Sequence, residues 1–261
     1  MWHKQCATQL AARYGRSVSW IRQQLDQYSP PLKQCQPYQT VIIADSIFWG
    51  RYYGITVFRD PHHQQNLFWR EVATETVESY IIGKQELTQR GFVITAIVSD
   101  GKPGLKEVFA DIPFQLCQFH QIATIHRYLT RNPKLPAGKD LRLIALSLPQ
   151  TSSEQFTERL LDWHKQWGSF IKQKTVNKVT GRWFYTHKRL RSAYRSLIRN
   201  QPYLFTYQQY PALNIPNTTN SLEGSFRNLK TMVRVHPGLN KRRRYRVITE
   251  ILGKSGTHIY Y

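Results

Sequence analysis

Apolar residues near the start of the chain recur at helical spacing on both sides of one glycine. They are Leu10, Ala11 and Tyr14 before Gly15, and Val18, Ile21 and Leu25 after it. This spacing predicts two short helices joined by a turn within residues 8 to 25. Ser17 is suited to cap the second helix, because its hydroxyl can accept a hydrogen bond from a first-turn amide.

The two short helices have the outline of a helix-turn-helix. Ser19, Arg22 and Gln23 are the polar residues of the second helix that could reach base edges in a major groove. An ordinary helical hairpin has the same pattern and stays open as the alternative. We place the boundary of this module at residue 30, where the run Tyr28-Ser29-Pro30-Pro31 ends it.

The next hundred residues alternate between strand and helix patterns. The expected strands are residues 40 to 44, 52 to 58, 67 to 72, 92 to 98 and 114 to 117, and the expected helices are residues 76 to 90, 105 to 109 and 122 to 129. The order βββαβαβα predicts a mixed sheet with helices packed on its faces, in the α/β class. We assign residues 38 to 130 to the first part of this core.

Strand signals fade after Pro133, and the pattern becomes helical. Residues 141 to 148, 156 to 171 and 190 to 198 read as helices, so residues 131 to 212 form a mostly helical insertion. The core returns over residues 213 to 261. Its helix is expected at residues 220 to 233, with Leu222, Phe226, Leu229 and Val233 on one stripe.

Composition adds a strong positive charge to this folded pattern. The chain has 261 residues, 37 Lys and Arg against 16 Asp and Glu, and 41% hydrophobic residues. It can bury a core, so its formal charge of +21 predicts a polyanionic partner, of which nucleic acid is the commonest and a membrane surface the weaker alternative. No apolar run is long enough to cross a bilayer, and three widely spaced cysteines fit reduced thiols in the cytosol.

The excess positive charge lies in the C-terminal part of the chain. Residues 163 to 261 hold 19 basic side chains and two acidic ones, Glu223 and Glu250. Basic residues interleaved with aromatic ones suit a surface that follows phosphates, although a solvated helical face over an aromatic core fits equally well. The basic run contains Lys241, Arg242, Arg243 and Arg244, and we interpret it as a tail that contacts phosphates or is merely solvated.

Three carboxylates stand where a catalytic site could form. Asp45 and Asp100 each follow an apolar strand pattern, and Glu223 is the single acid between Trp163 and Thr249. On a helical wheel Glu223 lies beside Arg227 and Lys230, away from the apolar stripe. Turns also favour aspartate, and Asn220 to Glu223 could be a helix capping box, so both structural alternatives stay open.

Converging carboxylates repel each other unless cations neutralise them. Mg²⁺, or Mn²⁺, prefers oxygen ligands, and two Asp with one Glu suffice to hold a pair of ions that activate a nucleophile and stabilise a leaving oxygen. The residues therefore predict a site for divalent metal beside a basic surface.

Four motifs in order resemble those of one family. They are Ala44-Asp45-Ser46 with Phe48-Trp49-Gly50, Val98-Ser99-Asp100-Gly101, Cys117-Gln118-Phe119-His120-Gln121, and Asn217-Thr218-Thr219-Asn220-Ser221-Leu222-Glu223-Gly224. Over nearly its whole length the chain resembles the Mutator-like superfamily of DDE transposases, in particular bacterial insertion-sequence enzymes with a C-x2-H signature.

The resemblance implies an RNase H-like core interrupted by an all-α insertion, with Asp45, Asp100 and Glu223 as catalytic metal ligands. Cys117 and His120 match the C-x2-H signature and are expected to organise the active site. They are too few for a zinc site, and a Cys-His nucleophile pair is the weaker alternative. Relatives can carry a Cys-rich zinc-binding segment before the helix-turn-helix, whereas Met1 stands almost inside this module. A truncated copy and a full-length active copy therefore both stay open as interpretations.

The implied function is DNA transposition: cleavage at element ends by metal-activated water, then joining of the 3′-hydroxyl to target DNA. The expected partners are double-stranded DNA, as terminal inverted repeats and target, and further copies of the chain on that DNA. No membrane partner is expected, and the expected location is the bacterial cytoplasm, associated with the nucleoid. The alternatives are a truncated, non-catalytic repressor that binds element ends and a metal-dependent, structure-selective nuclease on the same core.

Overall fold

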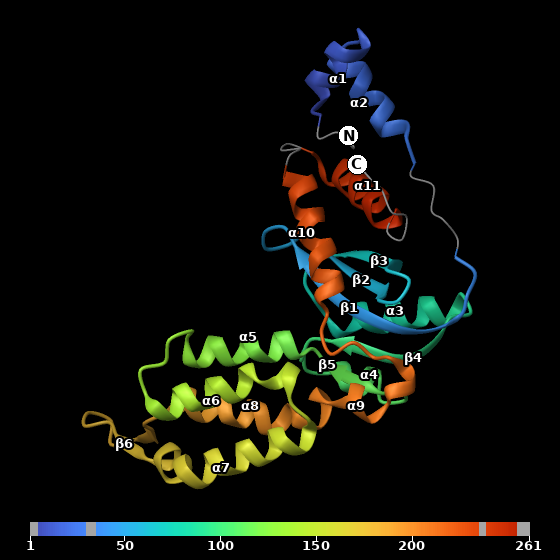
Figure 1. The fold of residues 1–261 in the computed structure, drawn as a ribbon. Helices are drawn as coiled ribbons and strands as arrows, with labels where there is room; N and C mark the ends of the chain where they lie inside the picture. The colour runs from blue at the N-terminus through green and yellow to red at the C-terminus, as the bar shows by residue number, and fades with distance from the viewer. Residues whose placement is uncertain (1–4, 30–34, 235–238, 255–261) are drawn as a thin grey trace. The chain divides into compact units, whose positions relative to one another are not determined.

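The chain divides into two compact units that alternate along the sequence. The computed structural model describes residues 5–29, 35–234 and 239–254 (Figure 1). The first unit comprises Met1–Val93 and Asn220–Tyr261, and the second comprises Ile94–Thr219. The second unit is therefore inserted between two segments of the first.

The first unit contains the expected three-stranded meander. Strands β1 (Gln39–Phe48), β2 (Gly54–Asp60) and β3 (Gln65–Val72) pair antiparallel, with Asp45 opposite Val57. Every residue of β2 is buried, so its polar residues do not form a face exposed to solvent. β1 extends from 39 to 48, beyond the apolar run by which it was predicted.

Three helices of the first unit are α3 (Val77–Gln89), α10 (Asn220–Arg234) and α11 (Lys241–Gly253). In α3, a side chain at Gly83 would lie 2.1 Å from the Phe58 ring, so this close approach to β2 requires glycine. The predicted apolar stripe of α10 is buried as expected. The run that begins at Lys241 is a helix rather than the expected tail, because Ile248 and Leu252 lie at helical spacing and are buried.

Two further strands complete this sheet, β4 (Val93–Ser99) and β5 (Phe114–Leu116), which pair in parallel. The strand order is β3-β2-β1-β4-β5, which makes one mixed five-stranded sheet. The short helix α4 (Leu105–Val108) lies between β4 and β5 in the sequence. The predicted order βββαβαβα is thus confirmed, and the α/β class with it.

The second unit is mostly helical after β5. Its helices are α5 (Gln118–Leu129), α6 (Pro136–Leu146), α7 (Ser153–Lys172), α8 (Lys188–Leu204) and α9 (Thr206–Gln209), with 3-10 turns at Leu148–Gln150 and Pro211–Leu213. Trp163 on α7 donates a hydrogen bond to the carbonyl of Ala137 on α6 at 2.9 Å. Across the described part of the chain, no helix combines the length and apolar character needed to span a membrane.

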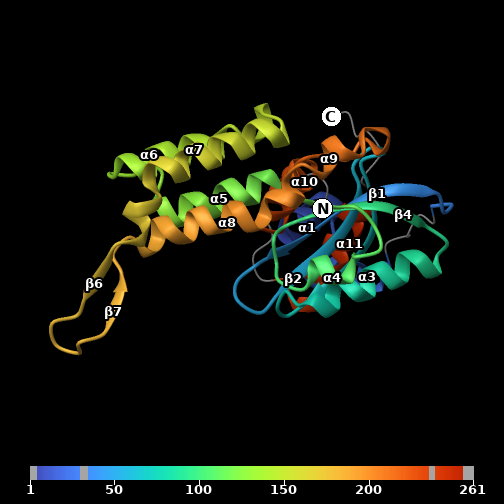
Figure 2. The same cartoon turned by 90° about the horizontal axis from the view of Figure 1, so that it is seen from below.

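Between α7 and α8 the structure has an antiparallel hairpin that the sequence pattern did not predict. Strands β6 (Lys174–Val176) and β7 (Trp183–Tyr185) form it, and they extend beyond the ends of the neighbouring helices (Figure 2). Strands of three residues are too short to show an alternation of apolar and polar positions. The sequence of this segment therefore indicated only its positive charge and its aromatic content.

The two predicted N-terminal helices are present as α1 (Ala7–Tyr14) and α2 (Val18–Gln27). Leu10, Ala11 and Ile21 are buried between them. Gly15 ends α1 with φ +59°, a left-handed conformation that favours glycine, and the Ser17 hydroxyl caps α2 by accepting from the Trp20 amide at 3.1 Å. Residues 1–4 and 30 of the predicted module, and residues 235–238 and 255–261 of the last segment, lie outside the described residues.

Candidate functional site

Asp45 lies within β1, directly after four buried apolar residues. Its side chain belongs to a residue only 9% exposed, and its Oδ1 accepts a hydrogen bond from the Ser46 amide at 2.7 Å. The apolar pattern placed Asp45 just beyond the end of a strand, but β1 continues through it to Phe48. The rigid central strand therefore fixes this carboxylate from within.

Glu223 stands in the first turn of α10, next to the buried Leu222, and is itself partly buried. One carboxylate oxygen of Glu223 and one of Asp45 lie within 4.8 Å of each other. The first unit thus brings together two of the three predicted carboxylates from opposite ends of the sequence. Two oxygen donors at this separation fit the donor chemistry of Mg²⁺ or Mn²⁺.

A buried hydrogen-bond network holds α10 and α11 to the sheet. The Arg59 guanidinium on β2 donates to the Ser221 hydroxyl of α10 at 3.0 Å and to the Asn66 side-chain oxygen at 2.9 Å. The Asn66 amide in turn donates to the Leu252 carbonyl of α11 at 3.1 Å. Because Ser221 precedes Glu223 by two positions, this network fixes the turn that carries the candidate metal ligand.

Sequence reasoning missed Arg59 and Asn66. Arg59 is 6% exposed, and burial lowers the pKa of its guanidinium while the neighbouring Asp60 carboxylate opposes that change. The available signal was the presence of a basic residue and an amide residue within strand patterns. Their partners Ser221 and Leu252 lie more than 150 residues away, so no local pattern could have identified those contacts.

Asp60 is a second buried carboxylate of the first unit, and its surroundings explain it structurally. Tyr38 donates to Asp60 Oδ2 at 2.6 Å, His63 Nδ1 lies 2.7 Å from the same oxygen, and the His62 and His63 amides donate to Oδ1. Burial raises the pKa of Asp60, but these hydrogen bonds outweigh it and the pKa is lowered overall. Asp60 therefore caps the turn between β2 and β3.

Asp100 belongs to the second unit and follows the last residue of β4. Its Oδ1 accepts from the Lys102 amide at 3.1 Å, which is the turn geometry that the alternative interpretation expected, and its side chain is partly exposed.

Cys117 is fully buried in the second unit, at the start of α5. Its sulfur lies 3.3 Å from the Thr219 hydroxyl and accepts from the Thr219 amide at 3.3 Å. Burial raises the pKa of the Cys117 thiol, but hydrogen bonding from the His120 side chain and the charge of that side chain outweigh it, so the pKa is lowered. The C-x2-H pair therefore interacts within the second unit, as its spacing on one helical turn allows.

Thr219 is the residue immediately before α10. It is fully buried. Two residues earlier, the Asn217 carbonyl accepts from the backbone N–H of Gln118 at 2.9 Å, and the Asn217 side chain donates to the Gln118 side-chain oxygen at 3.1 Å. The Cys117 sulfur thus anchors the chain just ahead of the helix that carries Glu223.

The predicted DNA-binding residues of the N-terminal module are exposed. Ser19, Arg22 and Gln23 all face solvent on α2. The end of α2 is attached to α11: Tyr28 donates to Glu250 at 3.0 Å, and Arg246 donates to the Leu25 carbonyl at 3.1 Å.

The basic run at the start of α11 is partly used inside the protein. Arg243 makes a two-pronged contact with the Asp26 carboxylate at 2.7 and 2.6 Å, which lowers the pKa of Asp26. Lys241 lies 3.0 Å from the Glu71 carboxylate, and Arg244 stacks over the Tyr53 ring at 5.3 Å. Arg242 is exposed, as are Arg227 and Lys230 on α10.

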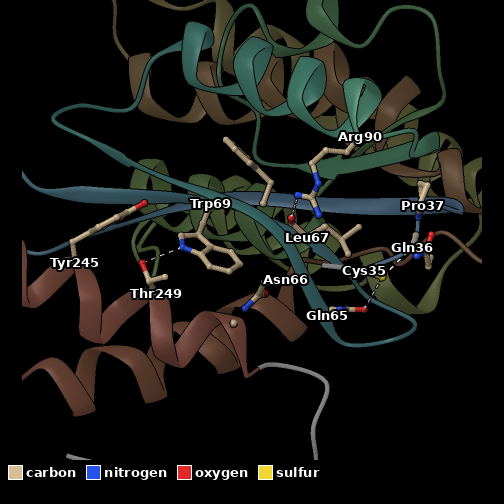
Figure 3. A pocket seen from close by; sticks show the side chains of 12 residues that line it. Cys35, Gln36, Pro37, Gln65, Asn66, Leu67, Trp69, Arg90, Tyr245 and Thr249 are labelled. Atoms are coloured by element: carbon tan, nitrogen blue, oxygen red, sulfur yellow. Dashed lines mark hydrogen bonds between the residues drawn. The ribbon is translucent and has the colours of Figure 1, made fainter. Parts of the chain in front are cut away.

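A cavity of about 710 Å³ lies beside the edge strand β3 and α11. Figure 3 shows Trp69 of β3 reaching Thr249 of α11, to whose hydroxyl it donates at 3.5 Å, and Arg90 donating to the Leu67 carbonyl at 2.6 Å. Its lining, among the described residues, mixes polar, aromatic and aliphatic residues and includes no carboxylate. It is distinct from the Asp45 and Glu223 pair.

Comparisons with known proteins add little to this geometry. No protein-family model matches the chain, and no curated protein matches it. Among solved structures, it is similar to a chain in the cryo-EM structure of the simian T-cell lymphotropic virus intasome in complex with PP2A regulatory subunit B56 gamma. That match has 13% identity, covers 69% of this chain and 68% of that chain, and has a TM-score of 0.26, which establishes neither a shared fold nor a shared function.

Proposed function

We propose that the protein is a DNA transposase of the DDE type, related to the Mutator-like superfamily, that cuts element ends and joins them to target DNA. The observation that carries the proposal is the pairing of Asp45 and Glu223 within 4.8 Å, in a chain of formal charge +21. Two close carboxylates in a basic protein suit metal-dependent chemistry on a polyanion.

In this proposal Asp45, Glu223 and Asp100 hold Mg²⁺ or Mn²⁺. Bound metal would supply an activated water or hydroxyl and stabilise the leaving oxygen of the phosphodiester. The order of the four motifs supports Asp100 as the third ligand. Within the second unit, Cys117 and His120 are positioning residues and take no part in the reaction, because the Cys117 sulfur holds Thr219, the residue that leads into α10.

The remaining roles divide between base reading and phosphate contact. Ser19, Arg22 and Gln23 are exposed on α2 and would read base edges. Arg227, Lys230 and the basic run of α11 would contact phosphates, which give affinity without sequence information. Arg243 also holds the module itself through Asp26.

The test is a strand-transfer assay with a labelled 3′-hydroxyl end and a supercoiled plasmid target, with and without Mg²⁺ or Mn²⁺. Asp45→Asn, Asp100→Asn and Glu223→Gln should each abolish metal-dependent cutting and joining while leaving DNA affinity nearly unchanged. Exposed Glu158→Gln and Asp162→Asn are matched controls and should remain active.

Each outcome of this assay has a definite reading. Joining by the wild type that is lost in the three carboxylate variants supports a transposase. Cutting without joining indicates a nuclease on the same core, and binding without cutting indicates a repressor. Metal-dependent activity that survives in the Asp45 or Glu223 variant would reject the assignment of the site.

A further inference from the structure

The hairpin of β6 and β7 concentrates positive charge at the end of the second unit. Between residues 172 and 191 there are seven basic side chains and no acidic one: Lys172, Lys174, Lys178, Arg182, Lys188, Arg189 and Arg191. Like charges gathered in one segment repel each other, which opposes folding. The pattern is complementary to a polyanion.

The tip of the hairpin has a defined turn. The Asn177 side-chain oxygen accepts from the amides of Val179 at 2.8 Å and Thr180 at 3.1 Å, and Gly181 has φ +67°. Glycine serves this left-handed position without strain. Val179 is 93% exposed at the tip, so the turn presents an apolar side chain between Lys178 and Arg182.

Aromatic rings on β7 are stacked against cations rather than buried. Lys174 Nζ lies 3.9 Å from the centre of the Trp183 ring, and Arg191 lies 3.9 Å from the centre of the Tyr185 ring. Trp183 nevertheless remains 55% exposed. A surface hairpin that only closed the unit would bury its largest ring, because burial of aromatic area stabilises the fold.

Exposed rings among cations are the combination that binds unstacked bases. Cations contact the phosphates, and the rings stack on base faces without regard to sequence. An intact duplex has its bases already stacked, so a ring gains this contact where a base is unpaired or its neighbour is missing. Such sites arise at the cut ends and gaps that strand transfer produces.

We infer that the β6–β7 hairpin is a second DNA-binding site, in which Lys178 and Arg182 contact phosphates and Trp183 stacks on an unstacked base at a cut or gapped end. The inference rests on the proposed function, because it takes DNA as the partner. It assigns a role to the second unit that is independent of the helix-turn-helix and of α11.

The test measures affinity of the full chain for an intact duplex and for the same duplex with a two-nucleotide gap, over a series of salt concentrations. Trp183→Ala should weaken binding to gapped DNA by about tenfold and leave intact duplex nearly unchanged. Lys178→Ala with Arg182→Ala should weaken both and reduce the slope of log affinity against log salt by about 1.8.

Matched controls lie in the same unit on exposed positions. Tyr210→Ala removes an aromatic side chain, and Lys134→Ala with Lys139→Ala removes two charges. The inference is overturned if Trp183→Ala behaves like Tyr210→Ala on gapped DNA, or if the Lys178 and Arg182 pair changes the slope no more than the lysine control.

The same proteins separate this inference from the proposed function. If the wild type cuts and joins DNA while the hairpin variants bind like their controls, the hairpin inference is wrong and the transposase proposal stands. If the hairpin variants show the expected losses but the wild type has no metal-dependent activity, the hairpin site stands and the transposase proposal fails. A wild type that binds neither DNA overturns both.

Discussion

Removing the Asn66 side chain should loosen both helices that flank the candidate metal site. Asn66 accepts from the Arg59 guanidinium at 2.9 Å and donates to the Leu252 carbonyl at 3.1 Å, and both Asn66 and Arg59 are 6% exposed. A hydrogen bond to a charged group contributes about 1.5 to 3 kcal/mol and a neutral one about 1 kcal/mol. We therefore expect Asn66→Ala to lower the free energy of unfolding by about 3 kcal/mol.

The variant Asn66→Asp separates the two ends of the network. An aspartate keeps an oxygen for Arg59 but cannot donate to the Leu252 carbonyl. Hydrogen exchange of peptides from α10 and α11 should therefore speed up in both helices of Asn66→Ala and mainly in α11 of Asn66→Asp. Urea titration of the same proteins gives the change in unfolding free energy.

The variant in which the amides of α10 exchange faster should cleave DNA more slowly, because Arg59 fixes Ser221 in the turn that carries Glu223. Asn66→Ala should therefore cut DNA more slowly than Asn66→Asp while both bind it equally. Asn132→Ala, at an exposed position, is the control. A loss below about 0.5 kcal/mol with unchanged exchange in α10 would refute this account of the network, since surface substitutions produce changes of that size.

Other variants test other parts of the molecule. Cys117→Ala removes the sulfur that accepts from the buried Thr219 amide and should lower the free energy of unfolding by about 1 to 3 kcal/mol. Cys117→Ser should lower it less and retain more activity. Equal losses in the two variants would contradict the anchoring role of the sulfur. The pKa of Asp60 is lowered from its ordinary value of 3.8, so its carboxylate stabilises the fold above that pH, and the contribution is lost as pH falls through the lowered pKa. Acid titration should show the wild type losing more stability than Asp60→Asn as the pH falls below about 4. Arg242→Ala should lower the slope of log affinity for DNA against log salt by about 0.9. Arg243→Ala should instead speed hydrogen exchange in α2, because Arg243 is bound to Asp26. The reverse result would show that Arg243 contacts DNA and that Arg242 supports the fold.

Local periodicity predicted most of the fold. The meander, α3, β4 and α10 each have an apolar spacing that one element satisfies by itself, so short windows of sequence contain the information. The helix position of Glu223 followed from the same kind of spacing, whereas Asp45 was placed after a strand and lies within β1. The proximity of the two carboxylates could not be predicted from spacing, because it depends on how α10 packs against β1.

The basic run of α11 shows how composition can mislead. Four consecutive basic residues suggested a tail, yet Ile248 and Leu252 further on are buried at helical spacing and would have predicted a helix. Arg243 is also bound to Asp26, so part of the positive charge holds the fold together. A net charge indicates a partner class, but it cannot say which cations face that partner.

The two acids of the C-terminal 99 residues have different explanations, and the difference gives a test of metal binding without activity. Glu250 accepts from Tyr28 and pairs with Lys254 at 2.7 Å, so the fold accounts for it. Glu223 lies beside another carboxylate, Asp45, an arrangement that a bound cation would stabilise. A ligand that binds only the folded state at 100 times its Kd adds about 2.7 kcal/mol to stability. Raising Mg²⁺ or Mn²⁺ should therefore increase the Tm of the wild type and of Glu158→Gln, and should increase that of Glu223→Gln much less. An equal shift in all three proteins would mean that the metal binds elsewhere, and the carboxylate pair would lose its assignment.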